Sequence, residues 1–175
     1  MKILICYDGS ADAKSAVNVV GHLFDRSTAV VLTVWDGLSE VVARAGSGLA
    51  VASLDFEGID RARDLAARAC AKEGTGHARA AGMPASALAV PCAESISKTI
   101  LDQAAEVDAD LIVLGSRGLS DAKAAVVGSV SRAVLHDADR PVLVVPTPEV
   151  ALKRSKKGRR RPQAPADLEF FTARL

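Results

Sequence analysis

Short apolar runs alternate along this chain with longer segments in which apolar residues recur every three or four positions. The runs have the length of strands and are apolar at nearly every position, which is typical of strands covered on both faces. The periodic segments are typical of helices with one buried side. Five apolar runs are found, at residues 2–7, 29–35, 86–90, 109–114 and 142–145. Four periodic segments lie between them, at residues 13–24, 59–81, 93–106 and 128–138.

The order of these segments predicts an α/β fold. Strands that alternate with helices pair in parallel through right-handed crossovers, which places helices on both faces of one sheet. We therefore expect residues 1–146 to form one domain, a doubly wound open parallel sheet of five strands. In such sheets, ligands bind beyond the carboxyl ends of the strands, at the point where the strand order reverses.

Two internal segments are less regular. Residues 36–58 show no clear periodicity and contain four glycines, which indicates a long loop with one helical turn near residues 40–44. In the second periodic segment, Gly74-Thr75-Gly76 is expected to end or kink the helix because glycine is a poor helix former. The spacing predicts that five residues of this helix face the core: Ile59, Ala62, Leu65, Ala66 and Ala69.

The final segment, 147–175, differs in charge from the rest of the chain. It carries 8 Lys and Arg against 3 Asp and Glu, whereas residues 1–146 carry 14 against 18. Seven of the nine residues in Lys153–Arg161 are basic. We expect an unstructured basic tail. It could bind nucleic acid or another acidic surface through its charge, and a solvated tail without a partner explains the same composition.

A glycine-rich segment after the fourth apolar run is the strongest candidate for a binding site. Gly115, Gly118, Gly128 and Ser129 follow the spacing G-x2-G-x9-G-S. Glycine lets the backbone approach a ligand closely. Free N–H groups at the start of the next helix then face an anion, with the helix dipole behind them. The pattern predicts a phosphate site, and a plain strand-to-helix connection capped by Ser129 is the simpler alternative.

A second candidate segment, Asp8-Gly9-Ser10, follows the first apolar run. Ser10 is suited to cap the next helix. Asp8 could contact a nucleotide, or it could be a turn aspartate that accepts a hydrogen bond from its own backbone. If the first and fourth strands are neighbours, this turn and the glycine segment face one crevice, which makes a nucleotide site more credible than either motif alone.

Other classes of site find little support in the sequence. It contains neither G-x4-G-K-[ST] nor G-x-G-x-x-G, which argues against P-loop and dinucleotide sites. Its three histidines lack the spacing of metal ligands. Cys6, Cys70 and Cys92 are far apart in apolar settings, as expected for reduced thiols in a cytoplasmic protein. The apolar runs are too short for a membrane span or a signal peptide, so we expect neither.

Residues 1–146 resemble the universal stress protein family in three places. Lys2–Ser10, with the sequence K-I-L-I-C-Y-D-G-S, is similar to the family's first strand and turn. Val113–Gly118 and Gly128–Ser131 resemble its ATP-loop signature, and Arg140–Pro146 resembles its final strand. The resemblance implies the strand order 3-2-1-4-5. It also implies an ATP-binding regulatory protein of the stress response.

The resemblance further implies which residues meet the base and the ribose. Asp8 and the backbone of Val34 would contact adenine. Tyr7, which is bulkier than the residue that many members carry before the aspartate, would lie at the edge of the purine. Leu114 and Gly115 would lie along the ribose.

For the phosphates, the resemblance implies a cradle formed by Gly118, Gly128, Ser129 and Val130. Mg²⁺ would be held through the phosphates and not by protein ligands. Arg117 lies in the same segment. It could meet phosphate, and a solvated loop charge is an equally good interpretation.

The resemblance implies a homodimer joined through Val142–Val145, and an exposed apolar edge strand favours such pairing. No obvious general base lies beside the glycine segment, so we expect slow or absent ATP hydrolysis and a response passed to an unidentified protein partner. Two alternatives stay open. One is a partner-binding module without nucleotide that uses the basic tail, and the other is an adenylyl-transfer or ATP-pyrophosphatase-like enzyme.

Overall fold

Five parallel strands form one sheet in the computed structural model, which describes residues 1–24, 26–38, 41–42, 55–116 and 127–158. The sheet order is β3-β2-β1-β4-β5. The strands are β1 (Lys2–Cys6), β2 (Thr28–Trp35), β3 (Ala85–Pro91), β4 (Leu111–Gly115) and β5 (Val142–Val145). The α/β class, the parallel pairing and the strand order predicted from the sequence are confirmed.

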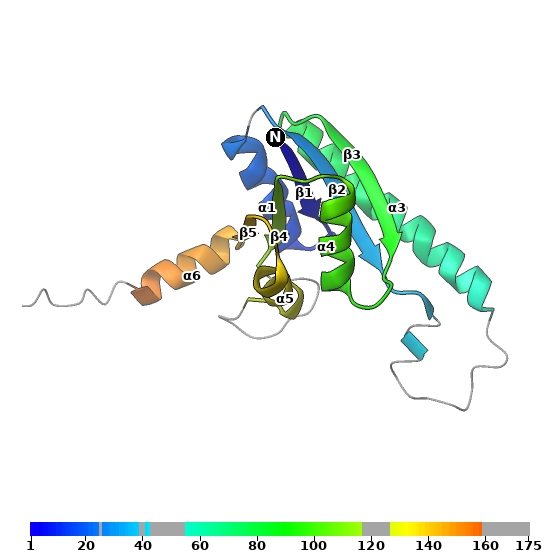
Figure 1. Cartoon of the computed structure of the whole chain (residues 1–175). Coiled ribbons are helices and arrows are strands. Elements are labelled where there is room, and N and C mark those ends of the chain that lie inside the picture. Colours follow the sequence, from blue (N-terminus) through cyan, green and yellow to red (C-terminus); the bar gives the residue numbers. More distant parts are fainter. Residues whose placement is uncertain (25, 39–40, 43–54, 117–126, 159–175) are drawn as a thin grey trace, which may run out of the picture.

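In the described part of the chain, two helices cover each face of the sheet (Figure 1). Helices α1 (Ala11–Leu23) and α3 (Phe56–Ala80) lie on one face, and α4 (Ile96–Glu106) and α5 (Ser129–Asp137) lie on the other. The central strand β1 pairs with β2 on one side and with β4 on the other, so Ile3 has Ala29 and Leu111 as its neighbours. The strand order reverses between β1 and β4, which places the expected ligand crevice at the carboxyl ends of these two strands.

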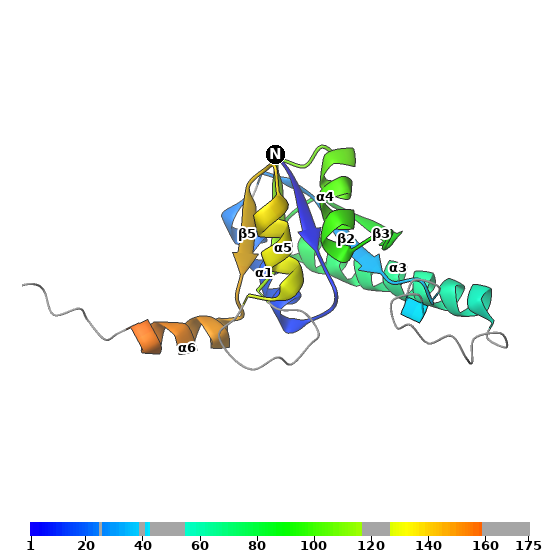
Figure 2. The ribbon, with the colours of Figure 1, turned by 60° about the horizontal axis from the view of Figure 1, so that its bottom comes forward.

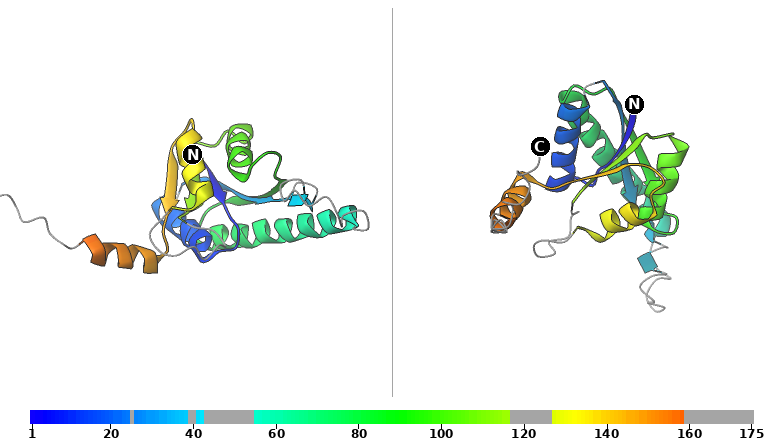
Figure 3. Two further views of the ribbon diagram at one scale, coloured as in Figure 1. Left: turned by 90° about the horizontal axis from the view of Figure 1, so that it is seen from below. Right: turned by 60° about the vertical axis from the view of Figure 1, so that its left-hand side comes forward.

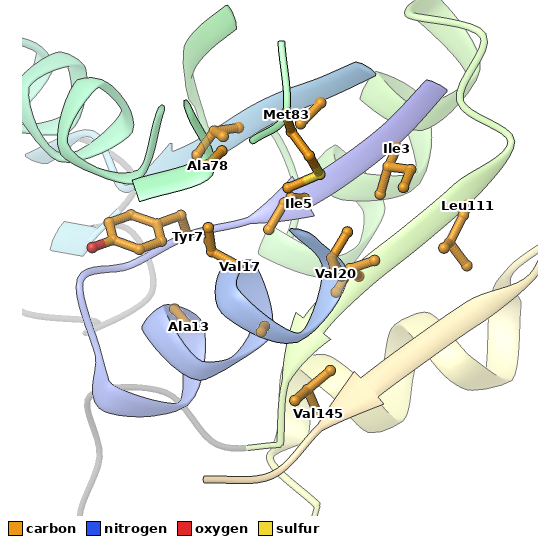
Figure 4. Packing of buried hydrophobic residues seen from close by; sticks show 14 residues of the cluster. Ile3, Ile5, Tyr7, Ala13, Val17, Val20, Ala78, Met83, Leu111 and Val145 are labelled. Carbon is orange, nitrogen blue, oxygen red and sulfur yellow. The ribbon is translucent and has the colours of Figure 1, made fainter. Parts of the chain in front are cut away.

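Successive residues of β1 enter the two halves of the core. Ile3 and Ile5 are fully buried in the cluster formed with α1 and α3, which Figure 4 shows from close by. Leu4 is fully buried in the opposite cluster, together with Ile100 of α4 and Val134 of α5. Burial on both faces explains why the strands appear in the sequence as continuous apolar runs.

Serine side chains cap α1 and α4. The Ser10 hydroxyl accepts the Ala13 N–H with an O–N distance of 3.1 Å, so Ser10 caps α1 as predicted. Helix α4 was expected from residue 93 but begins at Ile96, because the Ser95 hydroxyl accepts the Lys98 N–H at 3.2 Å and fixes the start of the helix there. The start of α3 is capped by the Asp55 side chain, which accepts the Gly58 N–H at 2.9 Å. Most of the helical turn expected near residues 40–44 falls outside the described residues.

The predictions for α3 were wrong in two respects. The helix runs unbroken through Gly74-Thr75-Gly76. Its buried side is also not the expected one, since Leu65 is 67% exposed and the buried residues are Ala67, Ala71, Gly74, Thr75 and Ala78. In Figure 3 the first half of α3 extends past the sheet, so the apolar residues there have no strand to cover. In the second half, small residues face inward because the helix lies close to the sheet.

Two glycines of α3, Gly74 and Gly76, should change the stability of the protein in opposite directions when replaced by alanine. At Gly74, an alanine Cβ would lie 2.7 Å from Cγ of Tyr7 and 2.8 Å from Cγ1 of Val31. Overpacking of this kind costs about 1–3 kcal/mol, more than the gain of about 1 kcal/mol from better helix propensity. At Gly76, a Cβ meets nothing within 4 Å. Urea unfolding should therefore show Gly74→Ala destabilised and Gly76→Ala stabilised by about 0.5–1 kcal/mol; two shifts of the same sign would contradict this packing.

The segment after β5 differs from the expected unstructured tail. Residues Pro148–Gly158 form helix α6, and the Thr147 hydroxyl accepts the Val150 N–H at 3.3 Å at its start. Figure 2 shows α6 leading away from the sheet beyond β5. The end of the basic segment, residues 159–161, lies outside the described residues. None of the helices in the described ranges is both long and apolar enough to cross a membrane.

Candidate functional site

A pocket of about 280 Å³ lies at the carboxyl ends of β1, β2 and β4, beside the start of α5. The volume is close to the lower end of the range for small-molecule sites. Eight of the residues singled out from the sequence line it: Tyr7, Asp8, Val34, Leu114, Gly115, Gly128, Ser129 and Val130. The other two, Arg117 and Gly118, lie outside the described residues. The turn after β1 and the segment after β4 thus border one crevice, as the strand order requires.

Asp8 both shapes the first turn and borders the pocket. Its Oδ1 accepts the Ser10 N–H at 3.0 Å, so the turn-forming interpretation of this residue is confirmed. Gly9 has φ +80°, a left-handed conformation that favours glycine. The same turn leaves Asp8 in the pocket wall, so forming the turn and facing a ligand are compatible roles.

Tyr7 borders the pocket while its ring packs away from it. The ring lies between α1 and α3 (Figure 4), and the residue is 2% exposed. Its hydroxyl donates to Oε1 of Glu73 at 3.0 Å, and burial together with Glu73 raises the pKa of the Tyr7 hydroxyl well above its usual range. The Tyr7 carbonyl accepts a bond from Oγ1 of Thr33 at 2.8 Å. The ring therefore does not crowd the space beside Asp8.

The start of α5 differs from the starts of α1, α3 and α4. Gly128 is its N-cap residue and makes no side-chain hydrogen bond to the helix. The interpretation of Ser129 as the cap was therefore wrong, because Ser129 is the first residue of the helix itself. Ser129 is exposed and lines the pocket together with Val130. The positive end of the α5 dipole consequently borders the pocket, and no side chain of the described residues is recorded as capping its first N–H groups.

Gly115 is needed by the packing of the protein. An alanine Cβ at this position would lie 2.8 Å from the carbonyl carbon of Asp12 and 2.9 Å from the nitrogen of Ala13. The end of β4 thus passes directly against the first turn of α1. The close approach brings Ala13 into the pocket wall beside Gly115.

Six further residues line the pocket that sequence reasoning did not assign to a site: Cys6, Ala13, Leu32, Ile96, Ile100 and Ser131. Ile96 and Ile100 recur at helical spacing within the periodic segment 93–106, and such spacing does not distinguish a core from a pocket wall. The Ser131 hydroxyl donates to the Gly115 carbonyl at 2.9 Å. Burial, and secondarily the charge of Asp8, raise the pKa of the Cys6 thiol to about 12, so Cys6 contributes a neutral surface.

Among the lining residues that the structure describes, Asp8 is the charged one. The lining combines aliphatic side chains, from Leu32, Ile96 and Ile100, with backbone and hydroxyl groups at the start of α5. Within the described ranges, no cluster of three His, Cys, Asp or Glu residues could hold a metal ion. The arrangement suits a ligand with a flat apolar part, a hydrogen-bond donor for Asp8 and an anionic end.

The family model of the universal stress proteins matches residues 1–146. The chain belongs to the universal stress protein family. None of the curated proteins compared with it matches this sequence. The fold of this universal stress protein is also found in 55 matching chains of solved structures.

Three of these structures illustrate the range of the family fold. Universal stress protein UspA from Lactobacillus plantarum is 23% identical over 83% of this chain and 97% of its own, with a TM-score of 0.64. The universal stress protein from Archaeoglobus fulgidus in complex with dAMP is 19% identical over 83% and 97%, with a TM-score of 0.58. A universal stress protein family protein from Arabidopsis thaliana with AMP bound is 17% identical over 83% and 91%, with a TM-score of 0.53. At these identities the likeness establishes the fold.

Proposed function

We propose that this universal stress protein binds ATP in the pocket between the β1–α1 turn and the start of α5, and that it acts as a regulator in a stress response. The observation that carries the proposal is the meeting of Asp8, the aliphatic wall and the start of α5, whose N-cap Gly128 has no capping side chain, in one crevice. Relatives of the same fold crystallised with dAMP and with AMP support an adenine nucleotide as the ligand.

Each part of the pocket has a role in this proposal. The adenine ring lies against Ile96 and Ile100, where the apolar wall excludes water. The Asp8 carboxylate accepts a hydrogen bond from the exocyclic amino group, and the Val34 backbone completes the base site. Leu114 and Gly115 border the ribose. A volume of about 280 Å³ suits the nucleoside part, so the phosphates extend outward along the start of α5.

The phosphate end of the proposed site consists of Gly128, Ser129 and Val130, with Arg117 and Gly118 from the segment outside the described residues. Phosphate oxygens would accept bonds from the first N–H groups of α5, and the helix dipole would stabilise their charge. Mg²⁺ fits this site as a companion of the phosphates, because Asp8 is the only carboxylate among the described lining residues. Bound Mg²⁺ would neutralise part of the triphosphate charge.

We propose a binding role in preference to a catalytic one. Hydrolysis needs a group that orients water at the terminal phosphate. Asp8 belongs to the base end of the proposed site, and no second titratable side chain other than thiol and phenol groups lines the described part of the pocket. ATP occupancy would then bias the interaction with a protein partner. The three free cysteines agree with a cytoplasmic location for that role.

A homodimer through β5 forms the second part of the proposal. β5 is at the edge of the sheet, and its residues Val142, Leu143 and Val144 are only partly buried. Addition of a second β5 would pair the free edge and cover these side chains. Helix α6 leads away from this edge (Figure 3), so the basic segment would lie near the dimer interface.

Native mass spectrometry of freshly purified protein and calorimetry test the proposal together. We expect a mass of two chains with a retained adenine nucleotide, and Mg-ATP binding that is at least tenfold tighter than Mg-GTP binding, because Asp8 accepts from an amino group that GTP does not present at that position. A chain ending at Thr147 should bind ATP within twofold of the full chain. The absence of heat at millimolar ATP would refute the proposed function. Loss of ATP binding in the shortened chain would contradict a nucleotide site formed by the pocket alone.

A further inference from the structure

A buried hydrogen bond joins the two sides of the pocket. The Ser116 hydroxyl donates to Oδ1 of Asp12 at 2.7 Å. Ser116 is fully buried and Asp12 is 5% exposed. Asp12 belongs to the first turn of α1, just after the Asp8 turn, and Ser116 directly follows β4. Neither residue lines the pocket itself, so contact with a ligand does not account for the pair.

The backbone of Ser116 also forms hydrogen bonds that hold the start of α5 in place. Its N–H donates to the Val145 carbonyl at 2.8 Å, and its own carbonyl accepts the Gly128 N–H at 2.8 Å. Gly128 is the N-cap of α5, so one residue connects α1, β5 and the helix start that faces the pocket. The bond from Ser131 to the Gly115 carbonyl at 2.9 Å ties the first turn of α5 to the neighbouring residue. Any displacement of Ser116 therefore moves the first N–H groups of α5.

A separate set of hydrogen bonds holds the base end of the pocket in place. The Asp8 turn is closed by the Ser10 N–H, and the Ser10 hydroxyl caps α1. The Tyr7 carbonyl is held by Thr33 from the adjacent strand. These bonds do not pass through Ser116. Loss of the bond between Asp12 and Ser116 should consequently loosen the α5 end of the pocket and leave the Asp8 end in place.

We infer that Asp12 and Ser116 are positioning residues that set the affinity of the pocket for the phosphates, without contacting the nucleotide. The inference rests on the proposed function and adds to it a pair of residues whose effect is confined to one end of the ligand. A hydrogen bond to a charged group in a buried site is among the stronger ones in proteins. Helix N–H groups bind an anion well only when they are held in place beforehand.

The test compares the affinities for ATP and adenosine by calorimetry in four proteins: the full chain, Ser116→Ala, Asp12→Asn and the control Thr75→Val. Thr75 also has a buried hydroxyl, which donates to the Ala71 carbonyl at 2.8 Å within α3, across the sheet from α5. We expect Ser116→Ala to bind ATP about tenfold more weakly, with adenosine affinity within twofold. Asp12→Asn keeps the shape and an acceptor oxygen, so its loss of ATP affinity should be smaller. Thr75→Val should change neither affinity.

Amide hydrogen exchange measures the mobility of the start of α5 without any ligand. In the unliganded protein, Ser116→Ala should exchange faster at residues 128–131 than the full chain, with α3 unchanged. Equal losses of ATP and adenosine affinity, or unaltered ATP affinity in a folded Ser116→Ala, would overturn the inference while leaving the proposed function standing. If Ser116→Ala does not fold, Asp12→Asn carries the same comparison. An unmodified protein that binds no ATP would instead refute the proposed function.

Discussion

Ser129→Asp should lower the affinity for ATP by roughly 100-fold in magnesium-free buffer while slightly stabilising the folded protein. Two like charges 4 Å apart repel each other by about 4 kcal/mol at the effective dielectric of a protein surface. Solvent screening at the exposed Ser129 reduces this to about 2–3 kcal/mol. An acidic residue at the first position of α5 also favours the helix dipole, by about 0.3–1 kcal/mol. Binding and stability thus change in opposite directions, which an unspecific defect would not produce.

Isothermal calorimetry and urea unfolding on the same samples check this expectation. Ser129→Ala is the matched control, because it removes the hydroxyl without adding charge and should lose less than tenfold in affinity. Adenosine should bind Ser129→Asp and the unmodified protein alike, since it carries no phosphate. Magnesium should restore part of the lost ATP affinity by neutralising phosphate charge. An unchanged affinity for ATP in Ser129→Asp would mean that the phosphates do not lie at the start of α5.

Gly115→Ala should destabilise the domain strongly. The added Cβ would lie 2.8 Å from the backbone carbonyl carbon of Asp12, and backbone cannot move aside as a side-chain end can. We expect the free energy of unfolding to fall by about 3 kcal/mol, with the melting temperature lowered by about 2–4 °C for each kcal/mol. ATP binding should weaken as well, because Ala13 and Gly115 form adjacent parts of the pocket wall.

The matched control for Gly115→Ala is Gly76→Ala, where the same added atom meets open space. Chemical unfolding of the two variants separates the effect of the close approach from the general effect of replacing glycine. If Gly115→Ala were as stable as the unmodified protein, the contact between β4 and α1 would be looser than the structure describes. The assignment of Gly115 to packing would then be wrong.

The elements of the fold could be read from the sequence because local patterns determine them. Strands covered on both faces are apolar throughout. Serine is a preferred N-cap residue, so Ser10 indicates where α1 begins. The order of strands is not a local property, because pairing of β1 with β4 joins residues more than 100 positions apart. Only the resemblance to a known family supplied it. The buried face of α3 was predicted wrongly because periodicity shows only which residues are apolar. Whether an apolar residue is buried depends on how far the sheet extends beneath the helix.

The candidate site could likewise be predicted only in part from the sequence. Its two motifs could be predicted to meet because parallel strands end at the same edge of a sheet. Ile96 and Ile100 looked like core residues, since a pocket wall and a core require the same side chains. The bond between Asp12 and Ser116 had no signal in the sequence, because neither residue belongs to a spacing that chemistry requires. Such partners become visible only when tertiary structure brings the two turns together.

The sequence separation of 104 residues between Asp12 and Ser116 has a consequence for how the protein is made. Contacts that close so long a loop form slowly, after local helices and neighbouring strands. During synthesis, β1 has β2 beside it long before β4 leaves the ribosome, so the crevice does not exist in the nascent chain. A ligand of this crevice can therefore stabilise only the finished domain, and it gives no help to the incomplete chain, whose central strand still has one open edge.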